Sequence, residues 1–409
     1  MRSSRWAGAV VAIALLMSSG CWWGQPGAGP GNTFANFDQD LTVGNVATLE
    51  QVWSGRGGLS AVVEGKVIGA YWTGSGVDVV AHDFTTGAEA WSHTLSPPGA
   101  VSGFPTHPPV VSGAGVWVGH LARTATGTCA FGLSRFDLAS GALLGTDTSF
   151  APGELVPFDD KVALASQTYT PSVGDSCMPG PSSVRVVDGA TGTTEWTSGF
   201  SSSQAITQVG DRIYGTSGPV LRSYPSAGCG AATCAPITQT QPAGVGAIND
   251  LAGEPSGPLF AIAVGPSFNQ LSLHAIDPAT GNSLGSTVLG VNASSLALAD
   301  GTVFVAGNTM VAAYDIASCA AGSCTLQWSA PLGGQVTFAN GLAVAGGVVY
   351  VGRDDGMVEA FAAGGCGTAT CPSLTSVSTG GTVLQLAVAQ GRLFVGSADD
   401  TVTAFAPAA

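Results

Sequence analysis

Alternating apolar and polar positions recur along this chain in two kinds of short segment. One has the form GxVxVG and is clearest as GVWVG at 115–119, GTVFVAG at 301–307, GGVVYVG at 346–352 and GRLFVG at 391–396. The other is a quartet of an apolar, a variable, a small and a bulky residue, and its copies end at His82, Phe136, Val187, Tyr224, Ile276, Tyr314, Phe361 and Phe405. A period of two residues is typical of β-strands, and no segment shows the period of a helix. The pattern predicts an all-β protein built from repeats.

The spacing of the repeats indicates the architecture. The quartets end about 46 residues apart, which matches a blade of four strands with loops of variable length. Eight such units predict an eight-bladed β-propeller of four-stranded antiparallel blades over residues 41–407. The eighth copy ends at Phe405 without an outer strand, whereas Leu49–Trp53 precedes the first complete blade. We expect this N-terminal strand to complete the last blade, because closing the ring removes an exposed sheet edge.

One turn of the repeat carries a longer motif. AHDFTTGAEAW at 81–91 returns as VVDGATGTTEW at 186–196 and, with Gly285 in place of the Trp, as AIDPATGNSLG at 275–285. The Asp can accept hydrogen bonds within the turn, the Gly allows positive φ, and the Trp can pack on the adjacent blade. The motif resembles the tryptophan-docking motif of quinoprotein-type propellers with PQQ-like repeats, and LTVGNVATLEQVW at 41–53 is similar to the start of such domains. The resemblance implies the fold over about residues 41–407 and leaves the chemistry open.

The N-terminal segment reads as a targeting sequence followed by a tether. Residues 1–20 contain two Arg, an apolar run and small residues, as expected of a signal peptide. The segment resembles a bacterial lipoprotein signal, since Ser19, Gly20 and Cys21 match the lipobox, although Ser18 stands where Leu is usual. The resemblance implies lipidation of Cys21, with ordinary cleavage further on as the alternative. Residues 21–40 are then a lipid-anchor tether, and the protein is exported to the outer face of the cell membrane or the periplasm.

Composition narrows the possible partners. The formal net charge is −14, and the few basic residues are scattered rather than clustered, so we expect no nucleic acid partner. Beyond the N-terminal segment, no stretch is long and apolar enough to cross a membrane. We expect a monomer whose membrane contact is the N-terminal lipid.

Eight cysteines other than Cys21 are interpreted as four disulfides. Six form CxxxxC pairs at the place where other blades carry the turn motif, so a small disulfide loop is expected to replace that turn. Cys129 and Cys177 lie in the two longest insertions, in adjacent blades, and should meet on one face of the disc. Zinc is the competing interpretation of CxxxxC, but these pairs lie on separate blades of an exported chain. The short pairs are Cys229–Cys234, Cys319–Cys324 and Cys366–Cys371.

The sequence contains few candidates for chemistry, and we predict no catalytic residue and no metal centre. Quinone-dependent alcohol dehydrogenases usually carry a disulfide between adjacent Cys, and this chain has neither adjacent Cys nor a CxxCH haem site. We therefore expect no cofactor, with PQQ and Ca²⁺ as the alternative. His82 and His274 are expected to be packed scaffold residues, since the five His lack ligand spacing. Asp354–Asp355 and Asp399–Asp400 follow GxVxVG strands and are predicted to lie in hairpin turns.

The mouth of the central channel is the first candidate binding site. Aligning the copies places one residue of each blade there, and Glu154, Asn249 and Asp250 would supply the oxygen ligands that Ca²⁺ prefers. The alternative is a polar channel without a ligand. Loops inserted in blades two and three, with His120, Arg123 and Tyr169, are the second candidate, because variable loops on rigid scaffolds commonly bind partners. The aligned channel positions are Ser60, His107, Glu154, Thr207, Asn249, Ser295, Asn340 and Gln385.

Together these features predict a non-catalytic, lipid-anchored, extracytoplasmic propeller that acts as a protein-binding or envelope scaffold. The layout resembles that of lipoprotein propellers that scaffold outer-membrane protein assembly. A PQQ-dependent or other secreted oxidoreductase is the alternative function. A carbohydrate-binding or hydrolytic propeller has support only from the fold class.

Overall fold

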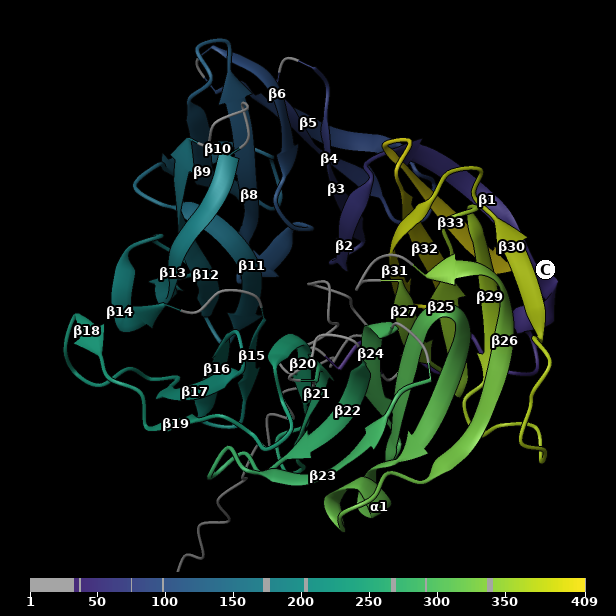
Figure 1. Ribbon diagram of the computed structural model, residues 1–409. Coiled ribbons are helices and arrows are strands. Elements are labelled where there is room, and N and C mark those ends of the chain that lie inside the picture. The colour runs from purple at the N-terminus through teal and green to yellow at the C-terminus, as the bar shows by residue number, and fades with distance from the viewer. Residues whose placement is uncertain are drawn as a thin grey trace, which may run out of the picture.

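Eight sheets surround a central axis, and each runs from an inner strand near the axis to an outer strand at the rim (Figure 1). The computed structural model describes residues 33–36, 38–74, 76–97, 99–171, 177–201, 205–265, 270–290, 293–336 and 341–408. Most strands are buried on both faces because each sheet packs between two others, and all five residues of β28 (Val348–Gly352) are buried. The eight-bladed propeller predicted from the repeats is confirmed.

The first four blades include the long insertions. Blade one contains β2 (Leu59–Val63), β3 (Lys66–Trp72), β4 (Val77–Asp83) and β5 (Glu89–Leu95). Blade two contains β6 (Ala100–Pro105), β7 (Val110–Ser112), β8 (Gly115–Thr124), β9 (Cys129–Asp137) and β10 (Leu143–Asp147). Blade three contains β11 (Ala151–Phe158), β12 (Lys161–Pro171), β13 (Cys177–Asp188), β14 (Thr194–Ser201) and the added strand β18 (Thr233–Cys234). Blade four contains β15 (Ile206–Val209), β16 (Arg212–Ser217), β17 (Val220–Pro225) and β19 (Thr238–Thr240).

The last four blades are more regular. Blade five contains β20 (Ala247–Gly253), β21 (Leu259–Val264), β22 (Leu271–Ile276) and β23 (Ser283–Val288). Blade six contains β24 (Ala293–Ala299), the long β25 (Thr302–Asp315) and β26 (Leu326–Val336), with the short helix α1 (Ile316–Ala320) between the last two. Blade seven contains β27 (Leu342–Ala345), β28, β29 (Met357–Ala362) and β30 (Thr375–Ser378). Blade eight contains β31 (Val383–Ala389), β32 (Arg392–Ser397), β33 (Thr401–Pro407) and β1 (Leu49–Arg56), which follows the short 3₁₀ helix η1 (Val46–Thr48).

The N-terminal strand closes the ring, as the sequence predicts. β1 pairs antiparallel with β33, in a register that runs from Leu49 opposite Pro407 to Arg56 opposite Thr401. The last blade therefore takes three strands from the C-terminus and its outer strand from the N-terminus (Figure 1). This pairing satisfies the backbone groups of β33 that would otherwise form an open sheet edge.

Tryptophans at the ends of blades dock on the following blade. A Cβ added to Gly141 would lie 2.5 Å from Cδ2 of Trp91, so only glycine leaves room for the ring. The same close contact joins Gly228 to Trp196 and Gly365 to Trp328. These glycines also have positive φ, which glycine adopts at little cost. Indole Nε1 groups donate to backbone oxygens of the next blade, from Trp53 to Phe84 at 3.1 Å, Trp91 to Leu138 at 3.1 Å and Trp328 to Ala363 at 3.0 Å.

The structure explains why Gly285 replaces a tryptophan in blade five. A Cβ added to Gly285 would lie 2.2 Å from the carbonyl oxygen of Cys319 and 2.8 Å from Cα of Gly322. The loop that begins with α1 thus fills the space that an indole ring occupies in other blades. A tryptophan at position 285 would require this loop to move.

The three short cysteine pairs form disulfides. Cys229–Cys234, Cys319–Cys324 and Cys366–Cys371 are bonded, which confirms the disulfide interpretation over zinc. The Cys229–Cys234 loop also supplies β18, which pairs parallel with β14 of the preceding blade. Cys129 is disulfide-bonded too. The side chain of Cys177 lies outside the described residues, so the Cys129–Cys177 pairing stays a prediction.

Residues 33–36 and 38–41, here called the N-terminal strap, cross three blades before β1 begins. The carbonyl of Thr33 accepts from Leu298 N at 2.7 Å, and Phe34 and Asn36 exchange backbone hydrogen bonds with Val344 at 2.8 and 3.1 Å. Asp38, which is buried, accepts from Gly391 N at 3.0 Å. The strap thus lies on the face formed by the turns between first and second strands, called the strap face. Its residues up to Asp40 belong to the predicted lipid-anchor tether at 21–40 and pack on blades six to eight. Cys21 and residues 1–32 lie outside the described residues.

The aspartates of the turn motif make stability dependent on pH. Hydrogen bonds donated by Thr86 to Asp83 and by Thr191 to Asp188 hold the pKa of both carboxyls below the ordinary value. A carboxyl with a lower pKa in the folded state stabilises the protein above its unfolded pKa of about 3.9, and this contribution is lost as the pH falls through the folded pKa.

We therefore expect the urea midpoint of the wild type to fall between about pH 6 and about pH 3, and Asp188→Asn to reduce this fall. Urea unfolding of both proteins at the two pH values measures the difference. Equal pH dependence in the wild type and the variant would show that this carboxylate is not held by its turn.

Candidate functional site

Gln385, one of the predicted channel residues, connects the last blade to the first. Its Oε1 accepts from Ser60 N at 2.8 Å, and its Nε2 donates to Ser60 O at 2.5 Å. Only 1% of Gln385 is exposed. The side chain therefore replaces missing backbone pairing between two neighbouring inner strands, β31 and β2.

Another predicted channel residue, Glu154, follows the same pattern. Glu154 on β11 accepts from Ile206 N, in blade four, at 2.9 Å. Asp250 on β20 accepts instead from the adjacent Leu251 N, at 2.8 Å. The pairing register shifts at or just before the polar residue in each of the inner strands β11, β20 and β31. A bulge of this kind changes the direction in which a side chain points. The bulges direct Glu154 and Gln385 toward the next blade, where each side chain forms a hydrogen bond between blades.

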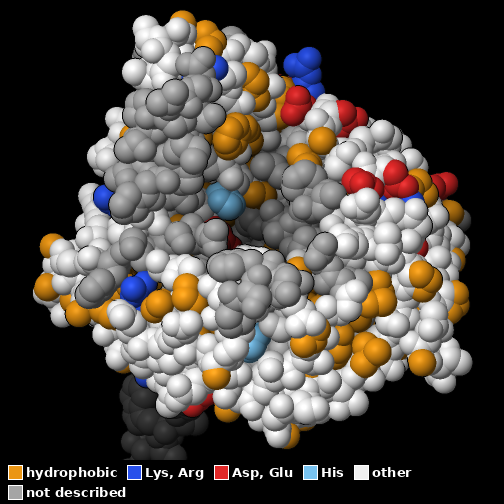
Figure 2. Space-filling model, in the orientation of Figure 1, with side chains coloured by type: hydrophobic (Ala, Val, Ile, Leu, Met, Phe, Trp, Pro, Cys, Tyr) orange, Lys and Arg blue, Asp and Glu red, His pale blue; other side chains and the backbone are white. Residues whose placement is uncertain are grey.

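The remaining channel positions have differing environments. Ser60, Thr207 and Ser295 are buried, Asn249 is exposed, and Asn340 lies outside the described residues. His107 is partly buried, and burial lowers its pKa to about 4, so the ring is neutral near pH 7. Burial raises the pKa of Asp250 to about 7, and its Oδ2 has no hydrogen-bond partner among the described residues. The centre of the disc is hollowed, with histidine side chains visible around it (Figure 2).

The predicted carboxylates are not gathered into a calcium site among the described residues. Glu154 and Asp250 come from blades three and five, and Glu154 bonds to the backbone of blade four, whereas Asp250 bonds to the adjacent Leu251. The described residues contain no group of three or more His, Cys, Asp and Glu side chains that could hold a metal ion.

The face opposite the strap face, called the loop face, is enlarged at blade two. The first half of β8 pairs with β7, and its second half continues outward and pairs with β6, from Pro105 opposite His120 to Ala100 opposite Thr124. β6 is the edge of this extension (Figure 1). It rests on blade one, since a Cβ at Gly103 would lie 2.7 Å from the Trp72 ring.

β6 exposes two large apolar side chains on this edge. Val101 is 52% exposed and lies at a shift in the pairing register of β6, and Phe104 is 54% exposed on the regularly paired part of the strand. An edge strand offers unpaired backbone groups, and exposed apolar side chains beside them favour contact with another chain. The predicted loop residues His120 and Arg123 lie on β8, next to this edge, whereas the side chain of Tyr169 on β12 lies outside the described ones.

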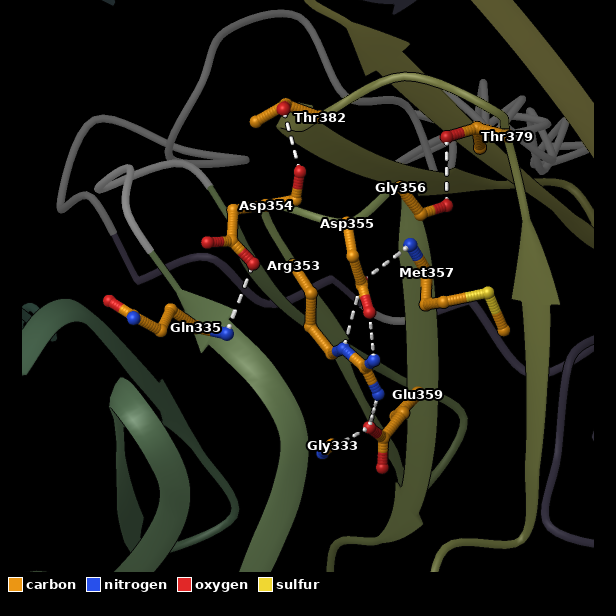
Figure 3. A network of polar contacts seen from close by, with 10 residues as sticks. All are labelled: Gly333, Gln335, Arg353, Asp354, Asp355, Gly356, Met357, Glu359, Thr379 and Thr382. Carbon is orange, nitrogen blue, oxygen red and sulfur yellow. Dashed lines mark hydrogen bonds and ion pairs between the residues drawn. The ribbon is translucent and has the colours of Figure 1, made fainter.

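A buried ion-pair network lies in the turn between β28 and β29 (Figure 3). Arg353 pairs with Glu359 and with Asp355, and its Nε donates to Asp355 Oδ1 at 3.0 Å. Glu359 also accepts from Gly333 N at 3.0 Å, and Asp354 accepts from Gln335 N at 3.1 Å, which ties the turn to β26 of blade six. The hydrogen bonds from Arg353 lower the pKa of Asp355. Asp354–Asp355 and Asp399–Asp400 both lie in hairpin turns, as predicted.

Two histidines are structural, as the sequence indicates. His82 is buried and bonds through its two ring nitrogens to the carbonyls of Gly87 and Arg56, at 3.0 and 2.6 Å. His274 is buried and bonds to the hydroxyl of Ser272 at 2.8 Å. Neither belongs to a group of potential metal ligands in the described residues.

The blade count and the docked tryptophans define the chain as an eight-bladed β-propeller. A family profile described as "Outer membrane protein assembly factor BamB" matches residues 269–365. The sequence matches no curated protein at a significant level. No helix in the described part of the chain is long and apolar enough to cross a bilayer.

Solved structures share the fold at low sequence identity. BamB from Moraxella catarrhalis is similar with a TM-score of 0.61 and 17% identity, covering 88% of this chain and 98% of that one. Quinohemoprotein alcohol dehydrogenase from Comamonas testosteroni is similar with a TM-score of 0.65 and 13% identity, covering 95% of this chain and 81% of that one. A computationally designed protein reaches a TM-score of 0.60 at 16% identity, covering 88% and 99%. These likenesses show the fold, and they include proteins of unrelated purpose.

Sequence analysis missed the exposed edge at β6. The run AVSGFP at 100–105 precedes the inner strand of blade two and has no counterpart in the other copies. Its alternation is a strand signal, but only the structure shows that this strand joins the outward part of β8. The inter-blade role of Glu154 and Gln385 was also missed, because their partners are backbone groups with no sequence signature.

Proposed function

We propose that this protein is a non-catalytic scaffold on the outer side of the cell membrane, anchored by its N-terminus, that binds an extended segment of a partner protein. The observation that carries the proposal is the exposed apolar edge of β6, with Val101 and Phe104. A peptide can add to such an edge through main-chain hydrogen bonds while its apolar side chains pack beside the exposed ones. The partner segment is therefore expected to be extended and to carry apolar side chains.

The N-terminal strap would orient the disc. An anchor that precedes Thr33 meets the propeller on the strap face, because the strap crosses blades six to eight there. The loop face, with β6 and the extension of blade two, would then point away from the membrane. This orientation leaves the proposed docking edge accessible to envelope proteins.

Export and lipid attachment are part of the proposal. The three short disulfides favour an oxidising compartment. The lipobox-like Ser19, Gly20 and Cys21 support lipidation of Cys21 after removal of the signal peptide. The match of residues 269–365 to a profile described by an outer membrane assembly factor supports a protein partner in the envelope.

Site-specific crosslinking in cells tests the docking edge. A photoreactive residue at Phe104 is expected to yield one repeatable protein adduct, and the same residue at Leu284, which is 40% exposed on blade five, is expected to yield none. With the photoreactive group at Val101, Phe104→Asp should reduce the adduct about tenfold, because a charge on the apolar edge is costly to bury. No repeatable adduct at β6, or equal adducts at positions 104 and 284, would refute the proposal.

An oxidoreductase is the second candidate, and the observation that favours it is the likeness to a quinohemoprotein alcohol dehydrogenase over 95% of this chain. Adding PQQ and Ca²⁺ to the folded protein and following dye reduction with sugars and alcohols separates the two functions. Substrate-dependent reduction would establish the oxidoreductase, and its absence together with a β6-specific adduct would establish the scaffold.

A further inference from the structure

A pocket of about 430 Å³ lies on the loop face between the outer parts of blades one and two. The end of β5 forms one side, with His93, Thr94 and Leu95, and β8 to β10 form the other, with His120, Phe131 and Leu143. Its volume is within the range of small-molecule sites, about 300–1,000 Å³. None of the described lining residues belongs to β6 or to the predicted channel positions.

His120 is built into this pocket. It is 4% exposed, and its ring lies on Gly132 of the paired strand, where an added Cβ would be 2.9 Å from Cε1 of His120. A side chain at position 132 would displace the ring. The Nδ1 atom of His120 is buried and has no hydrogen-bond partner among the described residues. A buried polar atom without a partner is costly.

The described lining carries hydrogen-bonding groups without formal charge. Burial lowers the pKa of His120 to about 4, so near pH 7 its neutral ring has one donor and one acceptor nitrogen. Thr94 donates its hydroxyl to Asp78 at 2.6 Å, and Thr146 shares a hydrogen bond with Ser134 at 2.8 Å. A hydroxyl that already donates keeps lone pairs to accept from a ligand. No Asp, Glu, Lys or Arg belongs to the described lining, so a charged ligand would lose its hydration without a counter-charge.

Apolar walls complete the pocket. Leu95, Phe131 and Leu143 line it beside the polar groups. The volume holds many water molecules, each of which takes about 30 Å³, so one bridging water does not account for the space. A ligand with an apolar body would gain from leaving water here, and a hydroxyl on it could bond to the more accessible His93 and Thr94.

We propose that this pocket binds a small uncharged ligand that carries a hydroxyl group on an apolar body. Phenol and a methyl glucoside are suitable uncharged probes, and benzoate matches phenol in ring size while carrying a charge. Leu143→Trp should fill the pocket, because Leu143 lines it and is 42% exposed. Leu144→Trp is the matched control, since Leu144 is 49% exposed on the same strand and is absent from the lining.

The imidazole NMR signals of His93 and His120 in the full soluble domain report binding. At least one uncharged probe is expected to shift them in a saturable way, with benzoate at least about tenfold weaker. Leu143→Trp should weaken probe binding at least about tenfold and Leu144→Trp less than about twofold. Density for phenol in the pocket of soaked wild-type crystals is expected independently of the variants. The absence of a saturable shift with both uncharged probes, equal binding of benzoate, or full binding by Leu143→Trp would overturn the proposal.

Discussion

Replacing Trp53 with alanine is expected to destabilise the propeller by about 3–5 kcal/mol, the usual cost of truncating a large buried aromatic side chain. Trp53 is 8% exposed, donates to Phe84 O at 3.1 Å, and lies within 6.0 Å of the Phe394 ring between blades eight and one. The variant would leave a cavity where the ring is closed. Chemical unfolding followed by intrinsic fluorescence or circular dichroism measures the loss.

Val52→Ala is the matched control for this prediction. Val52 neighbours Trp53 on β1 and is 44% exposed, so its truncation is expected to change stability by less than about 0.5 kcal/mol. Hydrogen exchange adds a local readout, because β33 amides should exchange faster in Trp53→Ala when β1 detaches. If both variants unfolded at the same denaturant concentration, the docked indole would not secure the closure.

Glu359→Gln is expected to cost about 3 kcal/mol, because it leaves the buried Arg353 guanidinium without one of its two carboxylates. Arg353 is 9% exposed and Glu359 is 7% exposed, whereas Asp355 is more accessible and remains as a partner (Figure 3). The expected loss of stability is therefore at the lower end of the range, about 3–5 kcal/mol, for removing one partner of a buried ion pair. Urea unfolding near neutral pH measures it.

Two further variants separate charge pairing from packing. Glu195→Gln removes the accessible ion pair between Lys161 and Glu195 and is expected to cost less than about 1 kcal/mol. The double variant Arg353→Met with Glu359→Met removes both buried charges and should recover most of the stability lost in Glu359→Gln. A single variant as stable as the wild type would mean that the Arg353 network is solvated and contributes little.

Much of the scaffold could be predicted because its signals are local. The Asp, Thr and Gly of each turn motif contact one another within a few residues, as Asp83 does with Thr86. The CxxxxC pairs are equally local, and all three form disulfides. The closing strand was predictable for a different reason, since a blade that lacks one strand requires a partner from elsewhere in the chain.

The candidate site was predicted less well. Glu154, Asp250 and Gln385 were placed correctly on inner strands, but as channel-facing residues. Bulges in those strands turn Glu154 and Gln385 toward the next blade, and a bulge of one residue depends on pairing rather than on the residue itself. Likewise, the sequence shows only that Gly285 stands where other copies of the motif have a tryptophan. The structure shows that the loop containing Cys319 occupies the space that the indole ring would need.

The sequence by itself determined the number of blades, the turn motifs, the short disulfides and the N-terminal closure of the ring. These follow from periodicity and from contacts between residues close in the chain, which a single sequence displays directly. Only the tertiary structure decided that Val101 and Phe104 are exposed on an edge strand, that His120 is buried in a pocket, and that the strap lies on one face. Exposure and enclosure depend on which distant segments pack together, and that information lies in the arrangement of blades rather than in any one repeat.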